Sequence, residues 1–157
     1  MADPLAVLVN GLPAAGKTTL ARALARDLGL PLLSKDVIKE AHAYVLGTER
    51  AGWPQRRWNA AIGAAASDTM WALLADAPAG AVLESTWPAD YRDFAVRGLR
   101  RAGQPPTLEI WCEVPSAWIR DRWWPSGHGG RSVTMDEPNA VLARGALRDD
   151  RRPRPPA

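Results

Sequence analysis

Short apolar runs alternate with amphipathic segments along the first two thirds of the sequence. Residues 5–9 form a continuous apolar run, the pattern of a strand that is buried on both faces. Leucines then recur every four residues over 17–28 between charged side chains, and Gly29 follows as a stop signal. The chain is therefore predicted to begin with a buried strand and an amphipathic helix.

The same two patterns repeat further along the sequence. They predict strands over 30–33 and 81–83 and helices over 37–45, 57–75 and 91–102. The longest helix is expected to carry along one side Trp58, Ile62, Ala65, Thr69 and Leu73. Apolar and polar residues alternate over 107–114, which indicates a strand with one well-buried face at the edge of a sheet.

Strands that alternate with helices predict an α/β fold with a parallel sheet and right-handed crossovers. The later segments are interpreted as a helix from Pro115, a flexible Gly/Ser/His segment over 125–130 and a short helix over 138–147. We expect a single domain over 1–147 and a disordered tail over 148–157, which holds three prolines.

Composition and charge restrict the class of protein. The chain has 157 residues, 46% of them hydrophobic and 24% charged, as in one soluble globular domain. The net charge of +3 comes mostly from four arginines in the last ten residues, so charge does not indicate a nucleic-acid partner. We expect no membrane partner and a cytoplasmic location, because a long apolar run and a basic signal-peptide start are both absent. The single cysteine, Cys112, excludes an intramolecular disulfide and offers no zinc site.

One motif carries a specific chemical signal. Residues 11–18 read Gly-Leu-Pro-Ala-Ala-Gly-Lys-Thr and lie between the first strand and the first helix. The glycines let the backbone wrap around a nucleotide phosphate, which can accept hydrogen bonds from successive amides and from the helix N-terminus. Lys17 supplies a positive charge to the β- and γ-phosphates, and the Thr18 hydroxyl can ligate Mg²⁺. A glycine-rich turn without a ligand is the alternative. The expected nucleotide-binding residues are Gly11, Leu12, Pro13, Ala14, Ala15, Gly16, Lys17, Thr18 and Thr19.

A glycine-rich phosphate-binding loop of this kind is called a P-loop. Other positions in the sequence narrow the class of P-loop protein to which the chain can belong. The Asn-Lys-x-Asp of GTPases and the strand-ending Asp-Glu of motor ATPases are both absent, which leaves the small-molecule kinases. Three further steps accompany the motif, namely Leu-Ser-Lys-Asp at 33–36, Val-Leu-Glu-Ser-Thr at 82–86 and Cys-Glu-Val-Pro at 112–115. With these residues the chain resembles the small P-loop kinases, a group of AAA-type ATP-binding proteins related to polynucleotide kinase, chloramphenicol phosphotransferase and zeta toxin.

This resemblance covers residues 5–130 and implies a three-layer P-loop NTPase fold, in which helices flank a short, mostly parallel sheet. Related folds usually carry a fifth strand beside the adenine site. The segment after Arg131 holds no apolar run long enough for it, so we expect the last strand to be absent or diverged.

The resemblance also implies residue roles. Asp36 would act on the acceptor hydroxyl as a base or an orienting acceptor, and a helix N-cap is the alternative. Glu84, at the end of the third strand, can hold Mg²⁺ through water together with Thr18, and a solvated carboxylate is the alternative. Arg122 and Arg131 flank a glycine-rich lid that would bring them onto the transferring phosphoryl group, and solvated arginines are the alternative.

Three tryptophans lie in or near segments that carry acceptor recognition in this fold, Trp53, Trp58 and Trp87. They can stack on a substrate or pack in the core, and packing is favoured. Together these features predict an ATP- and Mg²⁺-dependent kinase that moves the γ-phosphoryl group to a hydroxyl of a small molecule or a nucleic-acid end. Its expected catalytic residues are Lys17, Asp36, Arg122 and Arg131. The alternative is a catalytically weak or inactive ATP-binding protein that acts through a partner.

Overall fold

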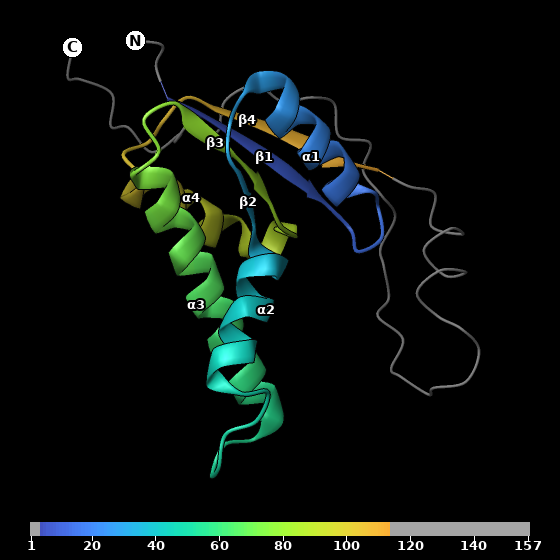
Figure 1. Ribbon diagram of the computed structural model, residues 1–157, viewed down its shortest axis with the longest axis vertical. Helices are drawn as coiled ribbons and strands as arrows, with labels where there is room; N and C mark the ends of the chain where they lie inside the picture. Colours follow the sequence, from blue (N-terminus) through green and yellow to red (C-terminus); the bar gives the residue numbers. More distant parts are fainter. Residues whose placement is uncertain (1–3, 114–157) are drawn as a thin grey trace, which may run out of the picture.

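Strands and helices alternate along residues 4–113, the part of the chain that this computed structural model describes (Figure 1). The strands are β1 (Leu5–Gly11), β2 (Leu32–Ser34), β3 (Gly80–Glu84) and β4 (Thr107–Cys112). The helices are α1 (Lys17–Leu28), α2 (Lys35–Leu46), α3 (Gln55–Ala75) and α4 (Arg92–Arg101), with the short 3-10 turn η1 (Ala89–Tyr91) before α4. Each element predicted within this range is present, and its bounds differ from the prediction by at most two residues.

The four strands form one parallel sheet in the order β2-β3-β1-β4. The central strands β1 and β3 are buried along almost their whole length, which explains their continuous apolar sequences. Among the described strands β4 lies at an edge, where Ile110 and Cys112 pack against the core and Trp111 is exposed. The predicted parallel α/β fold is therefore confirmed, and the carboxyl ends of all four strands lie along one edge of the sheet.

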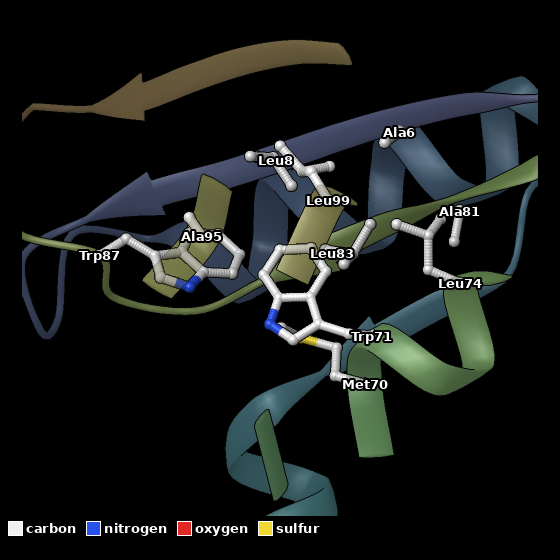
Figure 2. Packing of buried hydrophobic residues seen from close by; sticks show 10 residues of the cluster. All are labelled: Ala6, Leu8, Met70, Trp71, Leu74, Ala81, Leu83, Trp87, Ala95 and Leu99. Carbon is white, nitrogen blue, oxygen red and sulfur yellow. The ribbon is translucent and has the colours of Figure 1, made fainter. Parts of the chain in front are cut away.

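Helices cover both faces of this sheet and make the three layers. Successive side chains of a strand point to opposite faces, so Val7 and Val9 of β1 pack with α1, whereas Ala6 and Leu8 face α3 and α4. Figure 2 shows the cluster on the second face, in which the Trp71 side chain of α3 lies close to the sheet. Its buried members are Ala6, Leu8, Met70, Trp71, Leu74, Ala81, Leu83, Trp87, Ala95 and Leu99.

The buried face of α3 agrees with the prediction only in the first half of the helix. The helix buries Trp58 and Ile62, as predicted, and then Ala66, Met70, Trp71 and Leu74. Ala65 is exposed, Thr69 is only partly covered, and Leu73 is 46% exposed, so the prediction for these three positions was wrong. Alanines occur on every side of this helix and carry little periodic signal, so the fit of the large Met70 and Trp71 side chains against the sheet decides which face turns inward.

The helix α2 is present as predicted, but its apolar side is largely uncovered. Ile38 packs against the core, whereas Val37, Tyr44 and Val45 are exposed, and no residue of the helix is fully buried. Figure 1 shows the reason, since α2 runs beside α3 and both helices point away from the sheet. The second half of α2 therefore packs against α3 and not against the sheet, which leaves much of its apolar side exposed.

Gly98 of α4 lies very close to the Trp71 ring of α3, so a larger residue at this position should destabilise the protein. A Cβ atom at this position would lie 2.1–2.4 Å from three atoms of the Trp71 ring. We expect Gly98→Ala to lower the free energy of unfolding by about 1–3 kcal/mol, because the ring has to shift within a packed cluster. The matched control is Gly63→Ala in α3, where an added Cβ atom would meet nothing within 4 Å. This substitution should stabilise the helix by about 0.5–1 kcal/mol, because alanine favours a helix more than glycine does. Denaturant unfolding followed by circular dichroism measures both changes, and equal effects at the two sites would contradict this packing.

Several sequence predictions lie outside the described residues. These are the helix from Pro115, the segment over 125–130, the helix over 138–147 and the tail over 148–157. Within residues 4–113, no helix combines the length and the apolar character needed to cross a membrane.

Candidate active site

The loop between β1 and α1 has a backbone that suits a phosphate group. Gly11 and Gly16 have φ values of 143° and 80°, which favour glycine, and a Cβ at Gly11 would lie 2.6 Å from the Cys112 carbonyl oxygen. Ala14 also has a positive φ, 63°, at a cost on the order of 1 kcal/mol. The N-terminus of α1 has no side-chain cap and no acidic residue in its first turn. Its free amides and positive dipole end therefore remain available to an anion.

Lys17 opens α1 and turns its ammonium group back onto this loop. Its side chain is largely buried, and Nζ donates a hydrogen bond to the Leu12 carbonyl oxygen at 2.8 Å. Burial lowers the pKa of Lys17, while the negative charges of Glu84 and Asp36 oppose that shift and raise it. The result is a desolvated cation that lies near two carboxylates and beside the loop where phosphate oxygens would sit.

Glu84 lies beside α1 because β3 is the neighbour of β1 in the sheet. The Thr18 hydroxyl donates a hydrogen bond to Glu84 Oε1 at 2.5 Å. Glu84 is only 5% exposed, so the alternative of a solvated strand-end carboxylate was wrong. Its second oxygen, Oε2, is buried and has no hydrogen-bond partner within the described residues. A buried carboxylate oxygen without a donor, beside a threonine hydroxyl, suits a hard cation with its water ligands.

Asp36 lies in the first turn of α2, just after β2. The N-cap position of this helix is occupied by Ser34, so the N-cap alternative for Asp36 was wrong. The Asp36 side chain is exposed. Because Ser34 is paired with Glu84 across β2 and β3, the helix start that carries Asp36 lies next to the end of β3. The parallel sheet thus brings the phosphate loop, Glu84 and Asp36 to one edge.

The structure gives different surroundings to the three candidate tryptophans. Trp87 is buried against Trp71, with ring centroids 5.9 Å apart, and Trp58 is buried with its indole N–H donating to the Gly47 carbonyl oxygen at 3.0 Å. Both therefore pack in the protein, as favoured. Trp53 is half-buried in the loop that connects α2 to α3, where the guanidinium groups of two arginines lie over its ring, Arg50 at 4.9 Å and Arg57 at 4.5 Å from the ring centroid.

One residue of this region, Asn10, was missed by sequence reasoning. It ends the buried run of β1, is 1% exposed and makes four hydrogen bonds. The available signal was a polar residue at the end of an apolar run and directly before the glycine motif. The two lid arginines, Arg122 and Arg131, lie outside the described part of the chain.

The fold and the site together define a class of protein. A parallel sheet with a glycine-rich loop between its first strand and first helix, and a buried lysine opening that helix, is a P-loop nucleotide-binding fold. The chain belongs to the family described as AAA domain, whose sequence model matches residues 7–144. The resemblance to the small P-loop kinase group is thereby confirmed.

Solved structures agree with this class. A candidate kinase from Chloroflexus aurantiacus is 30% identical, with a TM-score of 0.64, and the match covers 78% of this chain and 66% of that protein. Shikimate kinase from Acinetobacter baumannii, solved with shikimate, is 21% identical with a TM-score of 0.50, over 77% of this chain and 62% of the kinase. A chain of the Pnkp1/Rnl/Hen1 complex is 14% identical with a TM-score of 0.55, over 96% of this chain and 48% of its own length.

The last two similarities are evidence for the fold alone. The chain spans less than two thirds of the length of all three proteins. A search of curated protein sequences finds no match. The family model and the candidate kinase at 30% identity therefore carry the similarity to the small P-loop kinases.

Proposed function

We propose that this protein transfers the γ-phosphoryl group of ATP, with Mg²⁺, to a hydroxyl group of a small molecule or of a nucleic-acid end. The observation that carries the proposal is the meeting of three groups at one edge of the sheet. A buried lysine faces the glycine loop, a buried carboxylate has one unpartnered oxygen, and an exposed carboxylate stands at the next strand end. Phosphoryl transfer needs mainly such positioning and charge.

The phosphate-binding part of the proposal rests on residues 11–19. The amides of this loop and of the α1 N-terminus would donate to the phosphate oxygens. Lys17 would exchange its bond to the Leu12 carbonyl for bonds to the β- and γ-phosphates, which compensate a buried cation better than one neutral carbonyl does. The loop therefore holds its main positive charge inside the site before the nucleotide arrives.

Thr18 and Glu84 are the residues that would hold Mg²⁺. Their fit is supported by the buried and unpartnered Oε2 of Glu84 and by the Thr18 hydroxyl beside this carboxylate, because Mg²⁺ prefers oxygen ligands. When bound, Mg²⁺ would neutralise negative charge shared by the β- and γ-phosphates. Thr18 keeps its hydroxyl directed toward this carboxylate through the hydrogen bond to Oε1.

Asp36 would accept or orient the proton of the attacking hydroxyl. Its exposed position at the start of α2 leaves it accessible to an acceptor, and its charge is close enough to Lys17 to raise the pKa of that lysine against the effect of burial. We propose that Arg122 and Arg131 complete the site by neutralising charge on the transferring group. The acceptor itself is proposed only as a class, an alcohol.

The test of this proposal is transfer of label from γ-labelled ATP. The full chain is incubated with Mg²⁺ and, in separate reactions, with a fractionated metabolite extract and with oligonucleotides that carry a free 5′-hydroxyl. We expect a labelled phosphomonoester in at least one reaction and none with Lys17→Ala. Release of inorganic phosphate is followed in parallel, because water can replace the acceptor. A protein that binds ATP but labels no acceptor would support the partner-dependent binding protein instead.

A further inference from the structure

The carboxamide of Asn10 joins three segments that lie far apart in the sequence. Its Oδ1 accepts hydrogen bonds from the Gly11 and Trp87 amides, both at 2.8 Å. Its Nδ2 donates to the Trp87 carbonyl oxygen at 2.8 Å and to Glu109 Oε1 at 2.9 Å. The two donors and the one oxygen of the amide are therefore all used, in a residue that is 1% exposed.

Asn10 directly precedes the phosphate-binding loop, and one of its four bonds is made to Gly11, the first residue of that loop. Gly11 is already confined by the close Cys112 carbonyl group, and its own carbonyl oxygen accepts a hydrogen bond from Thr86 Oγ1 at 3.2 Å. Two polar side chains, Asn10 and Thr86, thus connect the start of the loop to the segment that follows β3. That segment begins directly after Glu84, whose Oε2 is buried and unpartnered.

An apolar side chain at this position would carry no cost of burying polar groups. Asn10 follows Ala6 and Leu8 on the face of β1 that packs against α3 and α4, so its neighbours along the strand are core residues. A buried amide at such a position is costly unless every bond is made. The four bonds meet this condition only while the loop start and the segment after β3 keep one relative position, because the bonds come from both.

We propose that Asn10 is a positioning residue, which holds the start of the phosphate-binding loop in register with the segment after β3 and so sets the loop geometry that a nucleotide meets. All four of its hydrogen bonds go to protein groups, so it acts on a nucleotide only through the loop. The expected effect on Mg·ATP affinity rests on the proposed function. The relative position of the loop and the segment after β3 is a property of the ligand-free protein and can be measured without a nucleotide.

The variant Asn10→Asp tests the donors of the amide and keeps its shape. Aspartate retains the oxygen that accepts from Gly11 and Trp87, but it presents a second oxygen to the Trp87 carbonyl and to the Glu109 carboxylate. Two acceptors then face this oxygen without a donor, and two negative charges are adjacent. We expect the dissociation constant of Mg·ATP, measured by calorimetry, to rise at least tenfold.

The double variant Asn10→Asp with Glu109→Gln reverses the polarity of one bond. The new side-chain amide at position 109 can donate to the new carboxylate, which removes the charge repulsion and restores one of the two lost hydrogen bonds. We expect it to recover at least half of the lost affinity on a logarithmic scale. Glu109→Gln alone keeps an acceptor for Asn10 and should bind Mg·ATP within about threefold of the wild type.

A structural effect is separated from a positioning effect by Leu99→Ala. Leu99 belongs to the core cluster that also contains Trp87, and its aliphatic side chain forms no hydrogen bond to Asn10 or to the loop. Its truncation should therefore lower thermal stability and leave the Mg·ATP affinity unchanged. The amide exchange of Gly11 and Trp87 is measured by NMR in all ligand-free proteins. We expect faster exchange at these two amides in Asn10→Asp, return toward wild type in the double variant, and no selective change in Leu99→Ala.

The failures of the two proposals are distinguishable. A wild type that binds no Mg·ATP contradicts the proposed function, and the amide exchange of Gly11 and Trp87 then decides the register by itself. A wild type that binds, together with an Asn10→Asp variant of equal affinity, overturns the positioning role. So does a double variant as weak as Asn10→Asp, or a Leu99→Ala variant that loses as much affinity for the same loss of thermal stability.

Discussion

Replacing Lys17 with alanine should weaken Mg·ATP binding on the order of 100-fold. Lys17 is the one buried cation beside the phosphate loop within the described residues, and its ammonium group already lies at the loop through its bond to Leu12. A hydrogen bond to a charged group contributes roughly 1.5–3 kcal/mol, and about 1.4 kcal/mol corresponds to a tenfold change in affinity. Removal of this cation leaves the phosphates without their main counter-charge, and calorimetry with Mg·ATP measures the loss.

Two controls make this result specific to the site. Arg22→Ala removes an exposed cation from the same helix and should leave the affinity within about twofold, because exposed charges at a distance are screened. The thermal stability of Lys17→Ala should be equal to or above that of the wild type in the absence of ligand. Its charge is desolvated in the fold, as the lowered pKa of Lys17 indicates, so its removal relieves a cost. Equal affinity of Lys17→Ala and wild type would contradict nucleotide binding at this loop.

Replacing Asp36 with asparagine should lower phosphoryl transfer by about 10²- to 10⁴-fold, the usual contribution of a positioned acid or base. The affinity for Mg·ATP should stay within about threefold, because Asp36 lies outside residues 11–19 and its exposed side chain makes no hydrogen bond to the phosphate loop within the described residues. Initial rates with a labelled acceptor and calorimetry on the same preparations separate the two effects. The expected signature is a lower kcat with a nearly unchanged nucleotide affinity.

The matched control for this variant is Glu40→Gln, one turn later on α2. Glu40 is also exposed, so the two substitutions remove equal charge from the same helix. Neither should change the free energy of unfolding by more than about 1 kcal/mol, since Ser34 is the N-cap residue and Asp36 contributes only through the helix dipole. Unchanged turnover in Asp36→Asn, or equal losses in both variants, would contradict a specific role of Asp36 in phosphoryl transfer.

The regular elements were predictable because their signals are local. The apolar run of β1, the leucine spacing of α1 and the glycine after it each arise from neighbours within one turn or one strand. The phosphate loop was predictable for the same reason, since its glycines, Lys17 and Thr18 are adjacent in the sequence. The parallel arrangement followed from the alternation of strands and helices.

Other features depend on residues that are far apart in the sequence. The inward face of α3 was predicted correctly at Trp58 and Ile62 but not in the second half of the helix, where the packing of Met70 and Trp71 in the core cluster outweighs a weak alanine-rich period. Trp87 is a core residue because the fold places it against Trp71 and within hydrogen-bond distance of Asn10, and both partners are distant in the sequence. The sequence pattern of α2 likewise does not say that its second half leaves the sheet, which exposes Tyr44 and Val45.

The sequence alone thus determined the elements, the class of fold and the phosphate loop of this protein. The tertiary structure decided that Glu84 is buried against Thr18, 66 residues earlier, and that Asn10 bonds to Trp87, 77 residues later. The physical reason is the strand order β2-β3-β1-β4, which is an outcome of packing between whole elements. Placing β3 between β1 and β2 brings Glu84 beside both the phosphate loop and the start of α2, and no local pattern contains that neighbourhood.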